Sequence, residues 1–412
     1  MKNKLIAALI AIVATAGAAF AQNGIITPYS RFGYGILRDN ATAAQQSMGG
    51  IGYAMSSGRQ TNVMNPASYA RIDSLTYLFD MGIDFTSLWS SEAQADGTKL
   101  SENNVGGGLN YITMQFPLGK RLGMSVGILP YSSVGYAFGN SIDNGFASRE
   151  GSGSINMLYV GVAARVVAGL NLGVNVSYLF GSTINDTYAI TNSGSQSLYE
   201  DELTVRDWHL DAGLLYTLPI GRDQLTLGLT YSPAKSVLGH LRTYAYDVDA
   251  ESNASEHSRV KTKDLYSMAA SYGAGINYLH NDKLMLEADF TYQPWSKEKY
   301  AGQTGVLADR YKIAAGGYFQ PANRGSYLKR IQYRLGASYN RDYLVVRQNN
   351  VREYTASVGL GLPVPGFKTM INVGFEWKHR QAYPSALIKE DYLNITLGIN
   401  FNEMWFRKSR IY

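Results

Sequence analysis

One short pattern in the sequence matches the element on which many hydrolases present a nucleophile. In Gly123-Met124-Ser125-Val126-Gly127 the serine stands between two glycines, as in an elbow that joins a strand to a helix. Around Ser125, however, the residues alternate in the manner of a continuous strand, and no helical segment follows. We therefore expect no catalytic residue, and the one pair that a lipolytic site could use is Ser125 with His209 on an adjacent strand.

Acidic and histidine side chains do not have the spacing of a metal site. Asp247, Asp249, Glu251 and Asn253 alternate as in a calcium-binding loop, but Ser252 stands where the sharp turn of such a loop needs glycine. The five histidines are scattered along the chain, with no pair at ligand spacing. We expect a solvated loop here, and neither a metal ion nor a cofactor.

A larger set of ionisable side chains lies opposite the apolar face of the segments that carry them. In strands, every second side chain points to the same face, so in a closed sheet this set points inward. A packed interior requires such groups to hydrogen-bond to one another or to a plug, while a minority could line a path for a substrate. The set comprises Asp80, Asp84, Arg165, Asp207, His209, Asp211, Glu287, Asp289, Arg334, Glu376 and Lys378.

The elements that would position these residues are long segments in which apolar and polar residues alternate. In the last of them, residues 392–401, the large aliphatic side chains and Phe401 fall on odd positions and the polar or small ones on even positions. Many segments run to about ten residues, as membrane-crossing strands do, whereas strands of soluble sandwiches are shorter. We count about fourteen strands, an even number as in bacterial barrels. They begin near residues 75, 104, 122, 153, 170, 208, 225, 266, 284, 308, 331, 354, 369 and 392.

The connections alternate between short turns and long polar segments, which is the topology of an outer-membrane barrel with periplasmic turns and extracellular loops. We therefore expect residues 74–412 to form an all-β transmembrane antiparallel β-barrel. The first strand then starts in the periplasm and the last strand ends there. The short turns are expected at 117–120, 168–169, 219–223, 280–283 and 363–366, and the long loops at 90–103, 139–152, 186–202, 247–259, 294–306 and 380–390.

The two ends of the chain indicate export to the outer membrane of a Gram-negative bacterium. Residues 1–21 have a basic start, an apolar stretch and a small-x-small end, which predicts a signal peptide cleaved near Ala21/Gln22. Thr396, Gly398 and Phe401 resemble the signal by which the barrel assembly machinery recognises its clients, so this machinery is an expected partner during biogenesis.

Composition agrees with a membrane sheet and excludes several other classes. The 31 tyrosines and 43 glycines, with only 17% charged residues, favour strands with aromatic girdles. After the signal peptide no run approaches the ~18 apolar residues of a spanning helix. With no cysteine, disulfides and thiolate metal sites are excluded. The 37 basic residues form no cluster in the sequence, so nucleic acid is not an expected partner.

Residues 22–73 do not alternate and are rich in small residues. Ser47-Met48-Gly49-Gly50 favours tight backbone turns, because glycine accepts positive φ. Asn65 before Pro66 predicts the N-cap and first position of a short helix. We expect a hatch, or plug, with short helices inside the lumen; a flexible periplasmic tail is the alternative, but it would not explain the helix start.

In this order, after a signal peptide and before about fourteen strands, these motifs resemble the FadL-type family of outer-membrane transporters for long-chain fatty acids and other hydrophobic compounds. The resemblance covers essentially the whole mature chain. It implies a hatch in the lumen and diffusion of an apolar ligand through the barrel to a lateral opening in the wall. The hatch motif would consist of Ser47, Gly49, Gly50, Asn65, Pro66 and Ala67. The expected extracellular loops contain few apolar clusters, unlike a site that captures fatty acids.

Three functions from different classes remain open. The leading hypothesis is non-enzymatic uptake of hydrophobic, fatty-acid-like small molecules through a plugged barrel, with outer-membrane lipid and lipopolysaccharide as its surroundings. An accessory or scaffold role in protein secretion or surface attachment is the second. An outer-membrane lipolytic enzyme is the third and least favoured. The identity of the ligand lies beyond these patterns.

Overall fold

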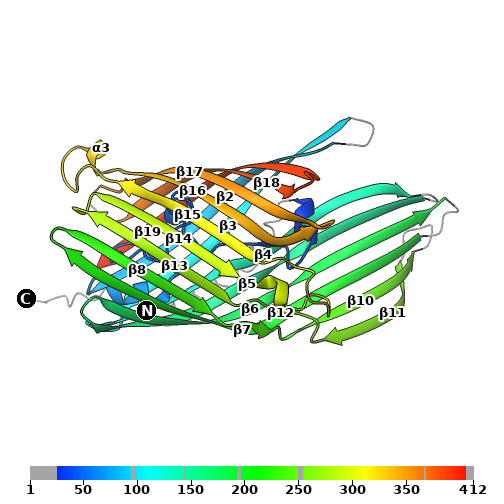
Figure 1. Cartoon of the computed structure of the whole chain (residues 1–412), viewed down its shortest axis with the longest axis horizontal. Helices are drawn as coiled ribbons and strands as arrows, with labels where there is room; N and C mark the ends of the chain where they lie inside the picture. Colours follow the sequence, from blue (N-terminus) through cyan, green and yellow to red (C-terminus); the bar gives the residue numbers. More distant parts are fainter. Residues whose placement is uncertain are drawn as a thin grey trace, which may run out of the picture.

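The computed structural model describes residues 26–93, 98–142, 145–192, 196–248, 254–365 and 368–404 (Figure 1). The expected signal peptide with its cleavage site, and Asp249, Glu251 and Asn253 of the expected acidic loop, lie outside the described residues. Within the described part of the chain, no helix has both the length and the hydropathy to cross a membrane.

Fourteen antiparallel strands form one closed barrel, in which neighbours in the chain are neighbours in the sheet and β19 closes against β2. The fold class expected from the sequence is confirmed. The strands are β2 (Thr76–Ala93), β3 (Lys99–Pro117), β4 (Leu122–Ile142), β5 (Gly145–Val167), β6 (Leu170–Thr191), β7 (Gln196–Ile220), β8 (Asp223–Ser232), β13 (Ser271–His280), β14 (Leu284–Gln293), β15 (Arg310–Phe319), β16 (Gln332–Val346), β17 (Asn349–Pro363), β18 (Met370–Tyr383) and β19 (Ile388–Met404).

The wall is interrupted where β8 and β13 end. The chain continues beyond them as β10 (Gly239–Val248) and β11 (Ala254–Lys263), while β9 (Lys235–Ser236) and β12 (Ser267–Met268) form a small separate sheet at the break. β7 therefore pairs with β8 along one half and with β10 along the other. β11 pairs with β10 alone, so within the described chain its second edge has no partner strand.

Most of the expected long loops are strands. Within 90–103, 139–152, 186–202 and 247–259 the strands run on through the described part of the polar sequence and pair with each other, and residues 380–390 belong largely to β18 and β19. The expectation of loops was wrong there, because a strand beyond the membrane pairs through its backbone and needs no apolar face. Residues 294–309 do form a loop, which contains the 3₁₀-helix η3 (Trp295–Lys297).

The two ends of the barrel differ in height. At one end, called here the short-turn end, most connections are tight; the longest joins β15 to β16 and contains α3 (Tyr327–Arg330). At the opposite, hairpin end, β4 to β7 with β10 and β11 extend far beyond the short strands β14 and β15 (Figure 1).

Large apolar side chains cover the outer surface and remain exposed, which in a single chain indicates contact with lipid. Aromatic rings line up from strand to strand near the hairpin end. Tyr231, Tyr272, Tyr292 and Tyr311 lie on four consecutive strands, with neighbouring ring centroids 5.3, 6.2 and 5.0 Å apart. Such a girdle marks one interface of the membrane.

Short elements before the first barrel strand fill the lumen: the 3₁₀-helix η1 (Pro28–Arg31), β1 (Ile36–Leu37), α2 (Ala43–Gln46) and the 3₁₀-helix η2 (Pro66–Arg71). α2 begins with a capping box between Thr42 and Gln45. η2 begins as the sequence predicts, because the Asn65 side chain accepts a hydrogen bond from the Ala67 N–H at 3.1 Å and Pro66 follows the cap.

The hatch lies so close to the wall that the wall has glycine at points where the two touch. A Cβ atom on Gly336 would lie 2.0 Å from the carbonyl carbon of Met48, and one on Gly213 would lie 2.1 Å from Oδ1 of Asn65. Both glycines therefore allow backbone approach that any other residue would prevent.

Candidate functional site

A cavity of about 110 Å³ lies between the hatch and the wall. Strands β15 to β19 and β2 supply its wall side, and the hatch segment after β1 supplies the other. Charged side chains dominate the lining: Arg38, Asp39, Asp84, Arg310, Lys312, Asp342, Glu353, Glu376, Lys378 and Arg380.

Asp39 of the hatch is held by two cations of β15. Its carboxylate lies 2.6 Å from Lys312 Nζ and 3.2 Å from a guanidinium nitrogen of Arg310, and its side chain remains 38% exposed to the cavity. Burial by itself would raise the pKa of Asp39, but the charges of Lys312 and Arg310 outweigh this effect and hold the pKa well below its usual range. Asp39 is therefore an anionic tether between the hatch and the wall.

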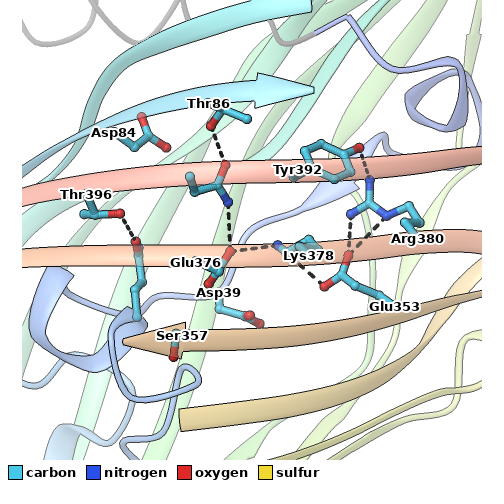
Figure 2. Close-up of polar contacts among 12 residues, drawn as sticks. Asp39, Asp84, Thr86, Glu353, Ser357, Glu376, Lys378, Arg380, Tyr392 and Thr396 are labelled. Carbon is cyan, nitrogen blue, oxygen red and sulfur yellow. Dashed lines mark hydrogen bonds and ion pairs between the residues drawn. The ribbon is translucent and has the colours of Figure 1, made fainter. Parts of the chain in front are cut away.

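A second charge network joins β17, β18 and β19. Arg380 donates to Glu353 at 2.6 Å and to the Tyr392 hydroxyl at 2.8 Å (Figure 2). Tyr392 in turn donates to Glu390 at 2.5 Å. Lys378 lies 3.5 Å from a carboxylate oxygen of Glu353. Because these groups are largely buried, each charge depends on its partners for stability.

Two of the expected inward residues, Glu376 and Lys378, belong to this network. Lys378 Nζ lies 3.5 Å from Glu376, and Glu376 accepts a hydrogen bond from Asn394 at 2.8 Å. Figure 2 shows both side chains pointing into the space above Asp39.

Three further expected residues bind the hatch backbone or a hatch cation. Asp289 accepts hydrogen bonds from the N–H groups of Gly52 and Tyr53 at 2.7 and 3.0 Å. Glu287 accepts from the Ala54 N–H at 2.9 Å, and Asp84 pairs with Arg38 at 3.3 Å. Three consecutive backbone donors of the hatch are thus satisfied by two wall carboxylates.

Other expected inward residues also contact the hatch or a neighbouring strand. Asp80 accepts from the hydroxyl of hatch Thr61 at 2.9 Å, and Arg165 donates to the carbonyl of Ala70 at 3.3 Å. Arg334 instead donates to Asn372 at 2.8 Å within the wall.

The remaining three lie at the break in the wall. Asp207 is fully buried and pairs with Lys235 at 2.5 Å, where it also accepts from the Leu238 N–H. His209 lies 3.1 Å from Asp211. These residues stabilise the bend between β8 and β10.

The glycines of the hatch motif turn the backbone after α2. Gly49 and Gly50 have φ values of 80° and 78°, and the Gly49 N–H donates to Ser357 Oγ at 2.8 Å. Ser47 binds back to the carbonyl of Ala44, while the Asn65 side chain donates to the carbonyls of Tyr53 and Leu214. The motif residues, including Pro66 and Ala67, thus shape the hatch and fix it to the wall.

Sequence reasoning missed an aromatic cluster that covers the hairpin side of the hatch. Tyr34 packs against Trp295 and Tyr300 of the loop after β14, with ring centroids 5.7 Å from each. Tyr343 donates to the carbonyl of Gly35 at 2.5 Å. Alternation gave no signal for this contact, because Trp295 and Tyr300 lie in a loop and Tyr34 in the hatch.

The wall has a gap between β3 and β4, which the hatch fills. β3 pairs with β4 only from Ile112 to Pro117, and beyond this point β4 pairs with β1 instead. The Thr27 N–H also donates to the carbonyl of Gly135 at 2.7 Å. A cavity of about 20 Å³ remains here, lined largely by polar side chains such as Asn110 and Asn156.

The described residues contain no pairing of Ser125 with His209. Ser125 Oγ lies 2.8 Å from the Tyr159 hydroxyl and donates to the carbonyl of Met114, whereas His209 has Asp211 as its partner. No group of three or more histidine or acidic side chains that could hold a metal ion lies in the described part of the chain.

Solved structures with this fold include toluene transporters and monoaromatic hydrocarbon channels. The P. putida toluene transporter TodX matches with a TM-score of 0.64 and 14% identity over 90% of this chain and 100% of that one. The Ralstonia pickettii toluene transporter TbuX gives 0.60 and 14% over 88% and 98%, and a Pseudomonas aeruginosa FadL homologue gives 0.60 and 13% over 90% and 99%. Comparison with curated protein sequences gives no match.

Fold and interior together define a closed fourteen-strand β-barrel with an N-terminal segment in its lumen, the fold of these channels and transporters. In outer-membrane barrels the end with short turns faces the periplasm, so we expect the short-turn end to be periplasmic and the hairpin end extracellular. Within this class, the chain belongs to the BamG family, whose model matches residues 1–412.

Proposed function

We propose that this barrel, although built on the fold of channels for hydrophobic compounds, acts as an accessory or scaffold barrel in protein secretion or surface attachment. One observation carries the proposal: the space between hatch and wall is lined by ion pairs. Sites for hydrophobic ligands are lined mainly by apolar and aromatic side chains, with few polar groups. Here a ligand beside the hatch would meet Arg38, Asp39, Arg310 and Lys312.

The cost of admitting an apolar molecule into this cavity is large, because it would remove water from charges that are only partly paired. The periplasmic vestibule, a cavity of about 920 Å³, does not offer an apolar route either, since Arg59, Arg71, Arg324 and Lys368 are among its lining residues. The interior therefore suits a fixed support for the hatch better than a path for cargo.

Uptake of hydrophobic small molecules, fatty acids included, is the second candidate. The gap between β3 and β4 favours it, because only the short strand β1 and its neighbours close the wall there. Movement of β1 away from β4 would open a lateral passage toward the lipid. The fold of the toluene transporters supports this candidate as well.

Uptake measurements separate the two candidates. Cells that contain or lack the protein are given radiolabelled toluene or oleate, and crosslinked cells are used to determine which envelope proteins purify with the barrel in fixed stoichiometry. We expect equal uptake and a stoichiometric envelope partner. The scaffold proposal would be overturned by protein-dependent uptake that is lost when β1 is fixed to β4 by a disulfide, introduced through the double substitution Ile36→Cys and Ser133→Cys.

The plug and the export route belong to the same proposal. Deleting residues 22–70 is expected to leave a folded barrel that leaks small solutes in liposomes, and an unchanged leak would contradict a plug. N-terminal sequencing of the mature protein is expected to begin near Gln22. Delayed insertion after substitution of Phe401 would support recognition by the barrel assembly machinery.

A further inference from the structure

The extracellular part of β7, β10 and β11 carries charged side chains directly beyond the membrane. Trp208 of β7 packs on Tyr178 of β6 with ring centroids 5.1 Å apart and points outward, in the aromatic girdle. Arg206 lies two residues further along the same face, ~7 Å along the strand. From here on, β7 continues with β10 and β11 as a sheet outside the membrane.

Strand pairing brings five basic side chains of these strands to one outward face. In the register, Thr204 of β7 is opposite His240, which is opposite Lys263 of β11. The next row outward is Glu202, Arg242 and Lys261. Because alternate residues share a face, both rows lie on the same side as Arg206 and Trp208. The cluster consists of Arg206, His240, Arg242, Lys261 and Lys263.

The positive charges of this cluster are incompletely balanced. Arg242 pairs with Glu202 at 3.1 Å, whereas Arg206, Lys261 and Lys263 have no carboxylate partner among the described residues. Burial and the nearby charges of Lys261 and Arg242 lower the pKa of His240. His240 Nε2 also has no hydrogen-bond partner in the described chain. The side chains are thus close enough to repel one another, and an anion would relieve this repulsion.

We propose that this cluster binds the phosphate groups of lipopolysaccharide in the outer leaflet. The cations face away from the lumen, toward the surrounding lipid, and begin directly beyond the girdle, where lipid phosphates lie. Several adjacent cations match a head group that carries more than one phosphate, and arginine and lysine are the side chains that bind phosphate. Among the described strands β11 has a pairing register with β10 only, which leaves the Lys261 and Lys263 side of the cluster open to a large glycolipid.

Titration of the purified barrel in nanodiscs with lipid A of defined phosphorylation tests the assignment. The variant Arg206→Gln/Lys261→Gln/Lys263→Gln removes the three unpaired cations and leaves the Arg242–Glu202 pair. The matched control Lys120→Gln/Arg222→Gln/Lys283→Gln removes three exposed cations at the periplasmic end. Heat-modified electrophoretic mobility verifies that each barrel is folded.

We expect bisphosphorylated lipid A to bind the wild type and the control equally, and to bind the cluster variant more weakly by on the order of a hundredfold, about fivefold for each cation. Dephosphorylated lipid A should not distinguish the three proteins. Equal binding of bisphosphorylated lipid A to the cluster variant would overturn the proposal. So would tight binding of inorganic pyrophosphate or of a polyglutamate peptide at the cluster without lipid A binding, since the site would then take a free anion or an acidic protein segment.

Discussion

The hatch-facing interior and the outer sheet, formed by β10, β11 and the part of β7 that pairs with β10, are built from the same kind of strand but hold their charges in opposite ways. Inside the barrel, Arg380 is 3% exposed and is surrounded by Glu353, Tyr392 and Glu390. In the outer sheet, Arg259 is 58% exposed and pairs with Glu256 at 3.0 Å. One ion pair is a structural part of the interior, and the other is a surface contact in water.

This difference indicates where the stability of the molecule resides. Buried charges cannot be removed singly, since each partner left behind would remain unpaired in a region that water reaches poorly. Exposed ion pairs are screened by water and salt, so replacing them changes the free energy of unfolding only slightly. We therefore expect substitution of a single buried charge in the interior to cost more stability than substitution of a charge in the outer sheet.

The largest effect is expected from Arg380→Met. It leaves Glu390 without its cation and Glu353 with Lys378 alone, and the loss of stability should be ~3–5 kcal/mol, as for a broken buried ion pair. The matched change Arg259→Met in the outer sheet should cost ~0–1 kcal/mol. Urea unfolding of both variants in lipid vesicles measures the difference, and equal losses would remove the distinction between the two regions.

A smaller effect is expected from Gly336→Ala, which forces a methyl group against Met48 and Gly49. Overpacking of this kind costs ~1–3 kcal/mol. Because the barrel strands remain paired, the strain should appear as displacement of the hatch, with faster solute leakage from liposomes. Gly119→Ala is the control, since no atom of the described residues beyond its two chain neighbours lies within 4 Å of the place that its added methyl group would take. Leakage equal to that of the control would argue against close hatch packing.

The pH dependence of stability tests one group of interior ion pairs, those of Asp39 with Lys312 and Arg310. The pKa of Asp39 is lowered in the folded protein because Lys312 and Arg310 outweigh the effect of burial, so its contribution to stability is complete above the unfolded value of about 3.9. It is lost as the pH falls through the lower folded pKa. The melting temperature of Asp39→Asn should therefore lie below that of the wild type equally at pH 7 and pH 5, and the gap should narrow only below about pH 4. A gap that closes between pH 7 and pH 5 would contradict this assignment.

The smallest effect is expected from Val260→Ala on β11, which is paired with β10 along one edge. Val260 is 56% exposed, and its truncation should change stability by less than ~0.5 kcal/mol. Val205→Ala, at a fully buried position of the same sheet, should cost ~1.5 kcal/mol or more. Thermal melts of both variants test this, and a large loss at Val260 would show that the edge of β11 is covered.

Alternation in the sequence was sufficient to predict the barrel, because lipid on one side and a packed lumen on the other impose a period of two. It also placed Glu287, Asp289 and Asp84 on the inner face, where the structure puts them against the hatch. The Asn65 cap was predictable for a local reason, since its partner lies two residues away.

Features that depend on strand register were not predictable in this way. The outer basic cluster has its members between residues 206 and 263, and only pairing of three strands brings them together. The same holds for Tyr34 with Trp295 and Tyr343, which are distant in sequence. Polar strands beyond the membrane resemble loops in sequence, because their outer face meets water and so lacks an apolar repeat.

The contacts of the first hatch residues have a consequence for the order in which the molecule is made. Thr27 donates to Glu390 of β19, and the Tyr29 hydroxyl bonds to Ile388 and Ala382, partners more than 350 positions away. The hatch therefore cannot take its final position until the last strands have reached the membrane. Contacts between residues so far apart in sequence form slowly. During assembly the first segment of the chain must therefore lie inside a sheet that is still open. Pairing of β19 with β2 then closes this sheet around the hatch as the last step.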